Sequence, residues 1–198
     1  MLNKLVKEYE DSIGCEIQQM SDEIEMLMKE IGDRKFESMA EIGVADGGSL
    51  WLYTNLFGKE GGRCTVTDMD IRPTAKKVMA AITERMGIQF KVVQCLSHNF
   101  ILKEPVGFLH IDGDHRYKSV KHDYYINGRA VVPGGIIVMH DTVSVPGPIQ
   151  FREELERNGV PTKTFRGYEN LCSCFGPNKT NPNRRSLGMT IVYKEKND

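Results

Sequence analysis

The sequence predicts an α/β protein with a doubly wound, mostly parallel sheet, preceded by a helical segment. Short apolar runs with the composition of strands alternate with stretches of helical length and composition. Such alternation is typical of strand–helix–strand crossovers, which set neighbouring strands parallel and cover both faces of the sheet. The chain has 198 residues, which fits one sizeable domain better than two small ones.

The N-terminal part carries an apolar stripe at helical spacing. The spacing predicts one amphipathic helix that ends near Gly32, with charged residues on its other faces. The stripe either packs on its own domain or, because its spacing has heptad regularity, pairs with a second copy in a homodimer. Its residues are Ile13, Ile17, Met20, Ile24, Leu27 and Ile31.

The alternating pattern follows this helix. The predicted strands are Ser38–Val44, Arg63–Met69, Gln89–Cys95, Val106–Asp112 and Gly135–Asp141. The predicted helices between them are Ser49–Phe57, Pro73–Met86 and Tyr117–Val131. Proline suits the first turn of a helix, which supports a start at Pro73. One more strand, Leu187–Lys194, is expected after the polar loop GPNKTNPNRRS.

Composition narrows the range of partners and compartments. Lys and Arg number 26 and Asp and Glu number 27, so no basic field points to nucleic acid or to an anionic membrane. The five cysteines do not form a zinc or disulfide pattern, and the pair Cys172 and Cys174 is too sparse for a four-ligand site. No apolar stretch has the length of a membrane span. We therefore expect a soluble, cytoplasmic protein with reduced thiols.

The ends of the predicted strands concentrate glycines and acids. In open α/β sheets, ligands bind beyond the carboxyl ends of the strands, where the strand order reverses. The first such end, EIGVADGGS, places Gly43, Gly47 and Gly48 in a turn where the backbone can approach a ligand closely. The turn has neither the G-x-G-x-x-G dinucleotide fingerprint nor a Walker A loop. With Asp68 at the end of the second strand, where a carboxylate can bind ribose hydroxyls, the pattern favours a nucleoside cofactor without a phosphate.

A second cluster follows the fourth strand in GFLHIDGDHRY. Asp112, Asp114 and His115 are crowded there, although like charges repel and are costly to desolvate. Such groups tend to persist where a metal or a proton transfer uses them. The alternative is an ordinary turn, because Asp and Gly are common turn residues.

Taken together, these motifs carry a resemblance to a known family. The series Glu41-x-Gly43-x-x-x-Gly47, the acid in TDMDIRP, IDGDH and PGGIIVMHDT resembles the class I S-adenosylmethionine-dependent methyltransferases. Within that superfamily the chain resembles the branch of cephalosporin-hydroxylase-like proteins and macrocin and rhamnosyl O-methyltransferases, and the resemblance covers about residues 36–141. It implies a seven-stranded, Rossmann-like sheet, with residues 35–198 as the cofactor-binding methyltransferase domain and residues 1–34 as a helical extension of that domain.

The resemblance also implies a cofactor site. Asp68 would hold the ribose, with Asp70 as the alternative, and residues 95–97 would flank the adenine. The glycine turn would hold the methionine side. The implied cofactor-binding residues are Glu41, Gly43, Gly47, Ser49, Asp68, Asp70, Cys95, Ser97 and Asp112.

In relatives that use a divalent metal, the matching ligands here would be Asp112, His140 and Asp141. His140 departs from the Glu or Asp that such relatives often carry. Imidazole is a softer ligand than carboxylate, which makes the choice between Mg²⁺ and Mn²⁺ open. The metal would orient and acidify an acceptor hydroxyl, and His115 would be the catalytic base, with Asp114 as the alternative.

The predicted function is S-adenosylmethionine-dependent O-methylation of a small-molecule hydroxyl, such as that of a sugar or a phenol. The expected partner is this methyl acceptor, without nucleic acid or membrane, and a homodimer is the open alternative for the N-terminal stripe. One alternative is an NAD-dependent oxidoreductase, against which the missing G-x-G-x-x-G argues. Another is a non-catalytic nucleoside-binding domain that acts within an assembly.

Overall fold

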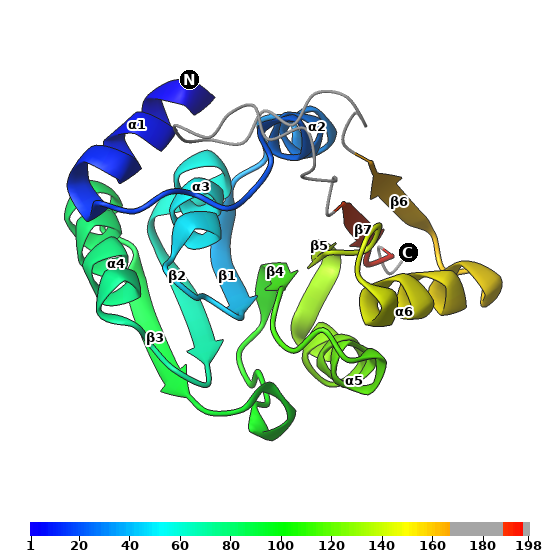
Figure 1. Cartoon of the computed structure of the whole chain (residues 1–198). Helices are drawn as coiled ribbons and strands as arrows, with labels where there is room; N and C mark the ends of the chain where they lie inside the picture. Colours follow the sequence, from blue (N-terminus) through cyan, green and yellow to red (C-terminus); the bar gives the residue numbers. More distant parts are fainter. Residues whose placement is uncertain (167–187, 196–198) are drawn as a thin grey trace.

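The computed structural model describes residues 1–166 and 188–195 and contains a seven-stranded sheet flanked by helices (Figure 1). The strands are β1 Phe36–Ile42, β2 Gly58–Asp68, β3 Gln89–Gln94, β4 Val106–Ile111, β5 Val131–His140, β6 Thr162–Phe165 and β7 Met189–Tyr193. The helices are α1 Leu2–Ile13, α2 Ser21–Ile31, α3 Gly48–Phe57, α4 Pro73–Met86, α5 Tyr117–Asn127 and α6 Pro146–Arg157. Two short 3₁₀ turns, η1 Ser97–Asn99 and η2 Gly128–Ala130, complete the described elements.

The strands lie in the order β3-β2-β1-β4-β5-β7-β6. The first five in this order pair in parallel, and β7 runs antiparallel to both β5 and β6. The predicted doubly wound, mostly parallel, seven-stranded sheet is confirmed. The chain moves outward from β1 to β3 and then returns to place β4 on the other side of β1. The switch point is therefore between the carboxyl ends of β1 and β4, where open sheets bind ligands.

Helices cover both faces of the sheet. In Figure 1, α1 to α4 lie on one side of the sheet, and α5 and α6 lie on the other. Alternate residues of the central strands contribute to two separate apolar clusters, as the two-residue period of a strand requires. On β5, Val138 faces the cluster under α1 to α4 and Met139 faces the cluster under α5 and α6. Both side chains are fully buried.

The N-terminal prediction of one long helix is wrong. Gly14 adopts the left-handed conformation and caps α1, its N–H bonding to the Glu10 carbonyl, and the chain is not helical again until Ser21. Ile17 and Met20 lie between the helices and are still buried, at 1% and 2% exposure. The apolar spacing therefore predicts correctly which residues are buried, but it does not show that the helix is broken. The predicted end of the helix near Gly32 is confirmed by the cap of α2.

The stripe packs within the chain. Ile24 and Leu27 of α2 are fully buried within the chain, which makes the first of the two alternatives correct for these residues. Glu23, on the same helix, is also fully buried, contrary to the expectation that charged residues lie on the other faces.

Later elements differ from the sequence predictions at three places. Helix α5 ends at Asn127 and a 3₁₀ turn follows, so β5 begins at Val131 and includes the turn residues before Gly135. Helix α6 and strand β6 have no counterpart among the predictions. The loop GPNKTNPNRRS, the pair Cys172 and Cys174, and Leu187, the first residue of the last predicted strand, lie outside the described residues.

No helix in the described part of the chain is long and apolar enough to span a membrane.

The burial of α2 leads to a prediction about stability. Replacing the fully buried Leu27 by Ala should lower the free energy of unfolding by about 2–5 kcal/mol, the usual cost of a large-to-small change in a core. The same change at Leu96, which is 46% exposed, should cost about 0.5 kcal/mol. Urea unfolding measures both, and equal midpoints for the two variants would contradict the packing of α2.

Candidate active site

The glycine turn between β1 and α3 lies at the switch point. Gly43 has a φ of 86°, which L side chains rarely adopt. Its N–H donates to the Thr67 carbonyl at 2.8 Å, and the Asp112 N–H donates to the Ile42 carbonyl at 2.8 Å. A Cβ at position 43 would lie 2.0 Å from the Asp112 carbonyl oxygen. The strand ends of β1 and β4 therefore meet so closely that only glycine fits.

Asp68, the predicted ribose ligand, also holds this turn. Its Oδ2 accepts hydrogen bonds from the Val44 N–H at 2.8 Å and the Ala45 N–H at 3.0 Å, and its Oδ1 accepts from the Asp70 N–H at 3.1 Å. Ala45 has a φ of 46°, so this turn contains a strained residue that the Asp68 carboxylate stabilises. The acid at the end of β2 thus shapes the glycine turn as well as facing the cavity described below.

Asp46 ties the turn to two helices. Its carboxylate accepts hydrogen bonds from Arg72 at 2.7 Å and from the Thr74 hydroxyl at 2.6 Å, at the start of α4. Its carbonyl accepts from the Tyr9 hydroxyl of α1 at 3.0 Å. Contacts with α1 and with the start of α4 therefore hold the glycine turn in place without a ligand.

Glu41 lies beneath the turn. It is 3% exposed, and its Oε1 accepts the Ser49 hydroxyl and lies 3.0 Å from Nδ1 of His110, which is fully buried. A buried carboxylate needs such partners, because an unpaired one is costly. Glu41 lines neither of the two cavities described here, so it supports the turn from within the sheet layer.

A cavity of about 480 Å³ opens beside the turn at the ends of β1 to β4. It is lined by five of the predicted cofactor residues, namely Gly43, Asp68, Cys95, Ser97 and Asp112, together with the predicted base residues Asp114 and His115. Ser49 lines a second, smaller cavity on the other side of Gly43. The structure therefore brings most of the predicted cofactor residues to one place. Gly47 instead packs against Val78, and Asp70 is exposed outside both cavities.

Two carboxylates and two imidazoles gather at the edge of the larger cavity. His115 Nε2 lies 3.3 Å from Asp112 Oδ1 and 3.0 Å from Asp141 Oδ2. His140 Nδ1 lies 3.6 Å from Asp112 Oδ2 and 3.2 Å from Asp141 Oδ1. In the part of the chain that the structure describes, Asp112, His115 and Asp141 form a group able to hold a metal ion. The predicted metal ligands Asp112, His140 and Asp141 are thus neighbours, and His115 joins them.

Asp141 is conformationally unusual. It has a φ of 61°, and its side chain is only 6% exposed. Non-glycine residues rarely adopt this conformation, and those that do are common at functional sites. Burial alone would raise the pKa of Asp141, but the hydrogen bonds with His115 and His140 outweigh it and lower the pKa below its ordinary value.

The same contacts shift the histidines. Hydrogen bonds with Asp112 and then Asp141 raise the pKa of His115 to about 10. For His140, burial opposes protonation, but the charges of Asp112 and Asp141 and contacts with Glu23 outweigh it and raise the pKa. Without a metal, both imidazoles are therefore the cationic partners of the carboxylates.

Asp114 faces a different set of partners. Its carboxylate accepts hydrogen bonds from Arg116 Nε at 2.7 Å and from the Ser119 hydroxyl at 2.8 Å, at the start of α5. The bond from Arg116 holds the pKa of Asp114 at about 2. Its role in the structure is to anchor the turn that leads into α5.

Glu23 is a site residue that the sequence analysis missed. Its Oε2 lies 3.6 Å from His140 Nε2, and its Oε1 accepts the Gly188 N–H at 2.7 Å. Thus α2 contributes a buried acid behind the predicted metal ligand. Glu23 follows Met20 and precedes Ile24 in the apolar stripe, and an acid on a buried face is the signal that could have identified it.

The fold and the site together define a class I, nucleoside-cofactor type of α/β enzyme. Residues 40–142, more than half of the chain, match the model of a family described as methyltransferase domain. The chain belongs to this family, which confirms the predicted class I S-adenosylmethionine-dependent methyltransferase and disfavours the oxidoreductase alternative. The narrower resemblance to the cephalosporin-hydroxylase-like branch stays a prediction.

Solved structures agree on the fold. A putative caffeoyl-CoA O-methyltransferase from Staphylococcus aureus superposes with a TM-score of 0.64 at 12% identity, covering 98% of this chain and 92% of that one. The O-methyltransferase TomG from Streptomyces achromogenes, in complex with SAM, gives 0.60 at 15% identity over 98% and 89%. A putative rRNA-methylase from Clostridium thermocellum gives 0.56 at 14% identity over 87% and 96%. A search of curated proteins found no match to this chain.

The close approach at Gly43 leads to a second prediction. Gly43→Ala should destabilise the protein by about 1–3 kcal/mol more than Gly61→Ala, because its Cβ clashes with the Asp112 carbonyl. Gly61 is a matched control, since its φ is 70° and its Cβ would meet nothing within 4 Å. Urea unfolding gives the difference. Equal losses in the two variants would mean that strain at positive φ, and not the clash, explains Gly43.

Proposed function

We propose that the protein transfers the methyl group of S-adenosylmethionine to a hydroxyl of a small molecule, with the help of a divalent metal. The observation that carries this proposal is the gathering of Asp112, His140 and Asp141, with His115 beside them, at the edge of the cavity next to the glycine turn. A metal-assisted O-methylation needs a cofactor pocket, a metal site and a base within reach of one another. The names of two solved relatives, both O-methyltransferases, support the same assignment.

The cavity supports the proposed cofactor position. Cys95 and Ser97 line the part where the resemblance puts the adenine, and Asp68 lies next to them. Asp68 Oδ1 accepts one N–H, from Asp70, and a carboxylate oxygen can accept a second hydrogen bond. A ribose hydroxyl could therefore bind Asp68 without breaking its contacts with the turn. Asp70 stays the alternative ribose ligand.

The donor set fits a divalent metal. His140 Nδ1 lies 3.2 Å from Asp141 Oδ1 and 3.6 Å from Asp112 Oδ2, so these three side chains would hold one cation between them. Carboxylate oxygens and an imidazole nitrogen are ordinary ligands of divalent metals. With an imidazole beside two carboxylates, we expect Mn²⁺ to bind more tightly than Mg²⁺.

Exposure separates the roles of the two histidines. The His140 side chain is 4% exposed, so it can ligate a metal but cannot reach an acceptor. The His115 side chain is 46% exposed and faces the cavity, so it can contact an acceptor hydroxyl. We therefore assign Asp112, His140 and Asp141 to the metal and His115 to the base.

The reaction is a direct displacement. A metal bound here would hold the acceptor oxygen and make its hydroxyl more acidic. His115 Nε2 takes the hydroxyl proton, and the oxygen attacks the methyl carbon as the carbon–sulfur bond breaks. The electron pair of that bond returns to sulfur, which leaves S-adenosylhomocysteine. The raised pKa of His115 belongs to the metal-free cluster, so the base role requires another cation beside the two carboxylates.

Asp114 is the weaker candidate for the base. With Arg116 and Ser119 on its oxygens and a pKa of about 2, it binds a proton poorly near neutral pH. A non-catalytic assembly domain is also less well supported, because a buried, strained acid such as Asp141 is costly for a protein that only binds.

The acceptor is proposed to be a small molecule such as a sugar or a phenol. The near-neutral charge of the chain argues against nucleic acid, although the same fold occurs in a putative rRNA-methylase. A cytoplasmic location stays a prediction, in keeping with free thiols at Cys15, Cys64 and Cys95. A homodimer also stays a prediction, without a surface assigned to it.

The function is tested by methyl transfer from S-adenosylmethionine to a catechol and to a methyl glycoside, with added Mn²⁺, Mg²⁺ or chelator. We expect Mn²⁺-stimulated formation of S-adenosylhomocysteine and a product with a methyl group on oxygen. Asp141→Asn should weaken Mn²⁺ binding by more than the roughly 10-fold that loss of an outer partner costs. Full activity of the wild-type protein in chelator would refute the metal.

The base is tested separately. His115→Ala should keep Mn²⁺ binding and lower the turnover rate by about 10²- to 10⁴-fold. His122→Ala is the control, because His122 lies on α5 beside Asp123 and outside the cavity. If His115→Ala instead loses Mn²⁺ binding, His115 is a ligand and the base must be sought elsewhere.

A further inference from the structure

A second, smaller cavity lies between the glycine turn and the segment that joins α1 to α2. It measures about 60 Å³, and its lining residues are Glu16, Gln18, Gln19, Gly43, Val44, Ala45, Asp46, Gly48, Ser49 and Asp112. Gln18, Gly43, Ala45 and Asp112 also line the larger cavity, so the two adjoin at Gly43. The smaller cavity has room for a head group of a few heavy atoms and none for an adenosine.

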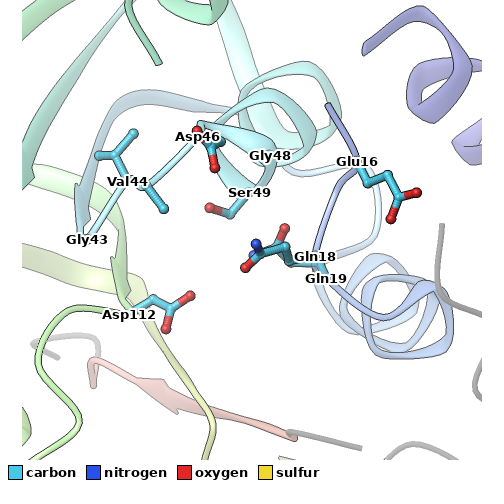
Figure 2. A pocket seen from close by; sticks show the side chains of 10 residues that line it. Glu16, Gln18, Gln19, Gly43, Val44, Asp46, Gly48, Ser49 and Asp112 are labelled. Carbon is cyan, nitrogen blue, oxygen red and sulfur yellow. The ribbon is translucent and has the colours of Figure 1, made fainter. Parts of the chain in front are cut away.

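Gln19 is the unusual residue of this cavity. It is 6% exposed, and within the described residues its Oε1 is buried without a hydrogen-bond partner. Buried amide oxygens normally have partners, so such a group needs an explanation. Figure 2 shows the side chains of Gln18 and Gln19 reaching from the joining segment toward the gap between Ser49 and Asp112. Glu16 points away from that gap.

The surroundings hold Gln19 in place. Met20, which follows it, and Ile17, two residues before it, are buried, so the chain on both sides of Gln19 is packed against the core. A Cβ at Gly48 would lie 3.3 Å from Gln19 Oε1, so the oxygen rests against the first residue of α3. The amide is therefore positioned by its neighbours, although none of them binds its oxygen.

The lining of this cavity offers groups of complementary chemistry. Helix α3 begins at Gly48 without a side-chain cap, and the first N–H groups of a helix favour a carboxylate. The Gln19 oxygen and the Asp112 carboxylate favour a cation. A zwitterionic α-amino-acid end, with an ammonium and a carboxylate on one carbon, satisfies both.

We infer that Gln19 binds the α-ammonium of the amino-acid end of the cofactor, and that the segment between α1 and α2 therefore belongs to the cofactor site. This inference rests on the proposed use of S-adenosylmethionine. Gln19 Oε1 accepts an N–H from the ammonium, while the start of α3 binds the carboxylate. The N-terminal segment thus distinguishes the full cofactor from a nucleoside that lacks the amino acid.

The test compares two ligands by calorimetry. S-adenosylhomocysteine carries the amino-acid end, and 5′-deoxy-5′-methylthioadenosine shares its nucleoside and thioether but lacks that end. Gln19→Leu should weaken binding of the first ligand at least about 10-fold, as loss of a bond to a charged group does, and should leave the second ligand within twofold. Gln150→Leu, the same change at an exposed position of α6, should alter neither.

A second variant tests the charge. Gln19→Glu keeps an acceptor oxygen, so it should bind S-adenosylhomocysteine at least as well as the wild-type protein. A loss as large as that of Gln19→Leu would overturn the ammonium assignment. Equal weakening of both ligands by Gln19→Leu would overturn the subsite as well, since Gln19 would then act through the fold.

The outcomes separate this inference from the proposed function. If the wild-type protein binds neither ligand, the cofactor assignment itself fails. If it binds both with equal affinity, the cofactor assignment stands and the amino-acid subsite is wrong.

Discussion

The contact between the backbones of β1 and β4 at the switch point is the constraint on which the site depends. Because Gly43 has no side chain, the Asp112 carbonyl can approach it, and the ends of the two strands stay side by side. This contact sets the glycine turn, whose amides then bind Asp68, and it sets the start of the loop that carries His115. Both cavities open on either side of Gly43. Because Gly43 has no Cβ, the glycine turn and the loop that carries His115 can lie next to each other.

The elements with local signals could be predicted from the sequence. Helix α4 has the expected limits because Pro73 favours a first turn and Gly87 caps the end in the left-handed conformation. The glycine turn and the acids at the strand ends could also be identified from local sequence, because glycines and acids directly after a buried strand are typical of ligand-binding turns. By contrast, α6 was missed although Pro146 gives it the same first-turn signal as Pro73 gives α4. Strand β6 has only four residues and pairs with β7, so its own sequence carries little pattern.

The N-terminal segment shows where such reasoning fails. Apolar spacing reports which residues are buried, and Ile17 and Met20 are buried although neither lies in a helix. Gly14, which breaks the helix, was the available sign. The stripe could have shown that Glu23 is buried, but the partners of Glu23 and Gln19 were not predictable, because His140 and Gly48 come from other parts of the chain. Long-range contacts of this kind leave no pattern within a window of sequence.

Two buried pairs, each of a glutamate and a histidine, support the residues that line the cavity. Glu41 and His110 support the glycine turn, and Glu23 and His140 support the carboxylates. The ring centroids of His110 and His140 lie 6.2 Å apart, with an angle of 74° between the ring planes, so the two pairs are neighbours in the interior. Buried ionisable groups and the strained Asp141 are costly to a fold, and proteins retain such features mainly where function requires them.

The contact of Glu23 with Gly188 has a consequence for the making of the protein. The two residues are separated by 165 positions, and the acid is fully buried between Gly188 and His140. At ordinary rates of translation, roughly 8–33 s pass between the synthesis of Glu23 and that of Gly188. During that time the hydrogen bond from the Gly188 N–H to the buried carboxylate cannot form. The surroundings of Glu23 are therefore complete only after the chain has been made as far as the start of the last strand, β7.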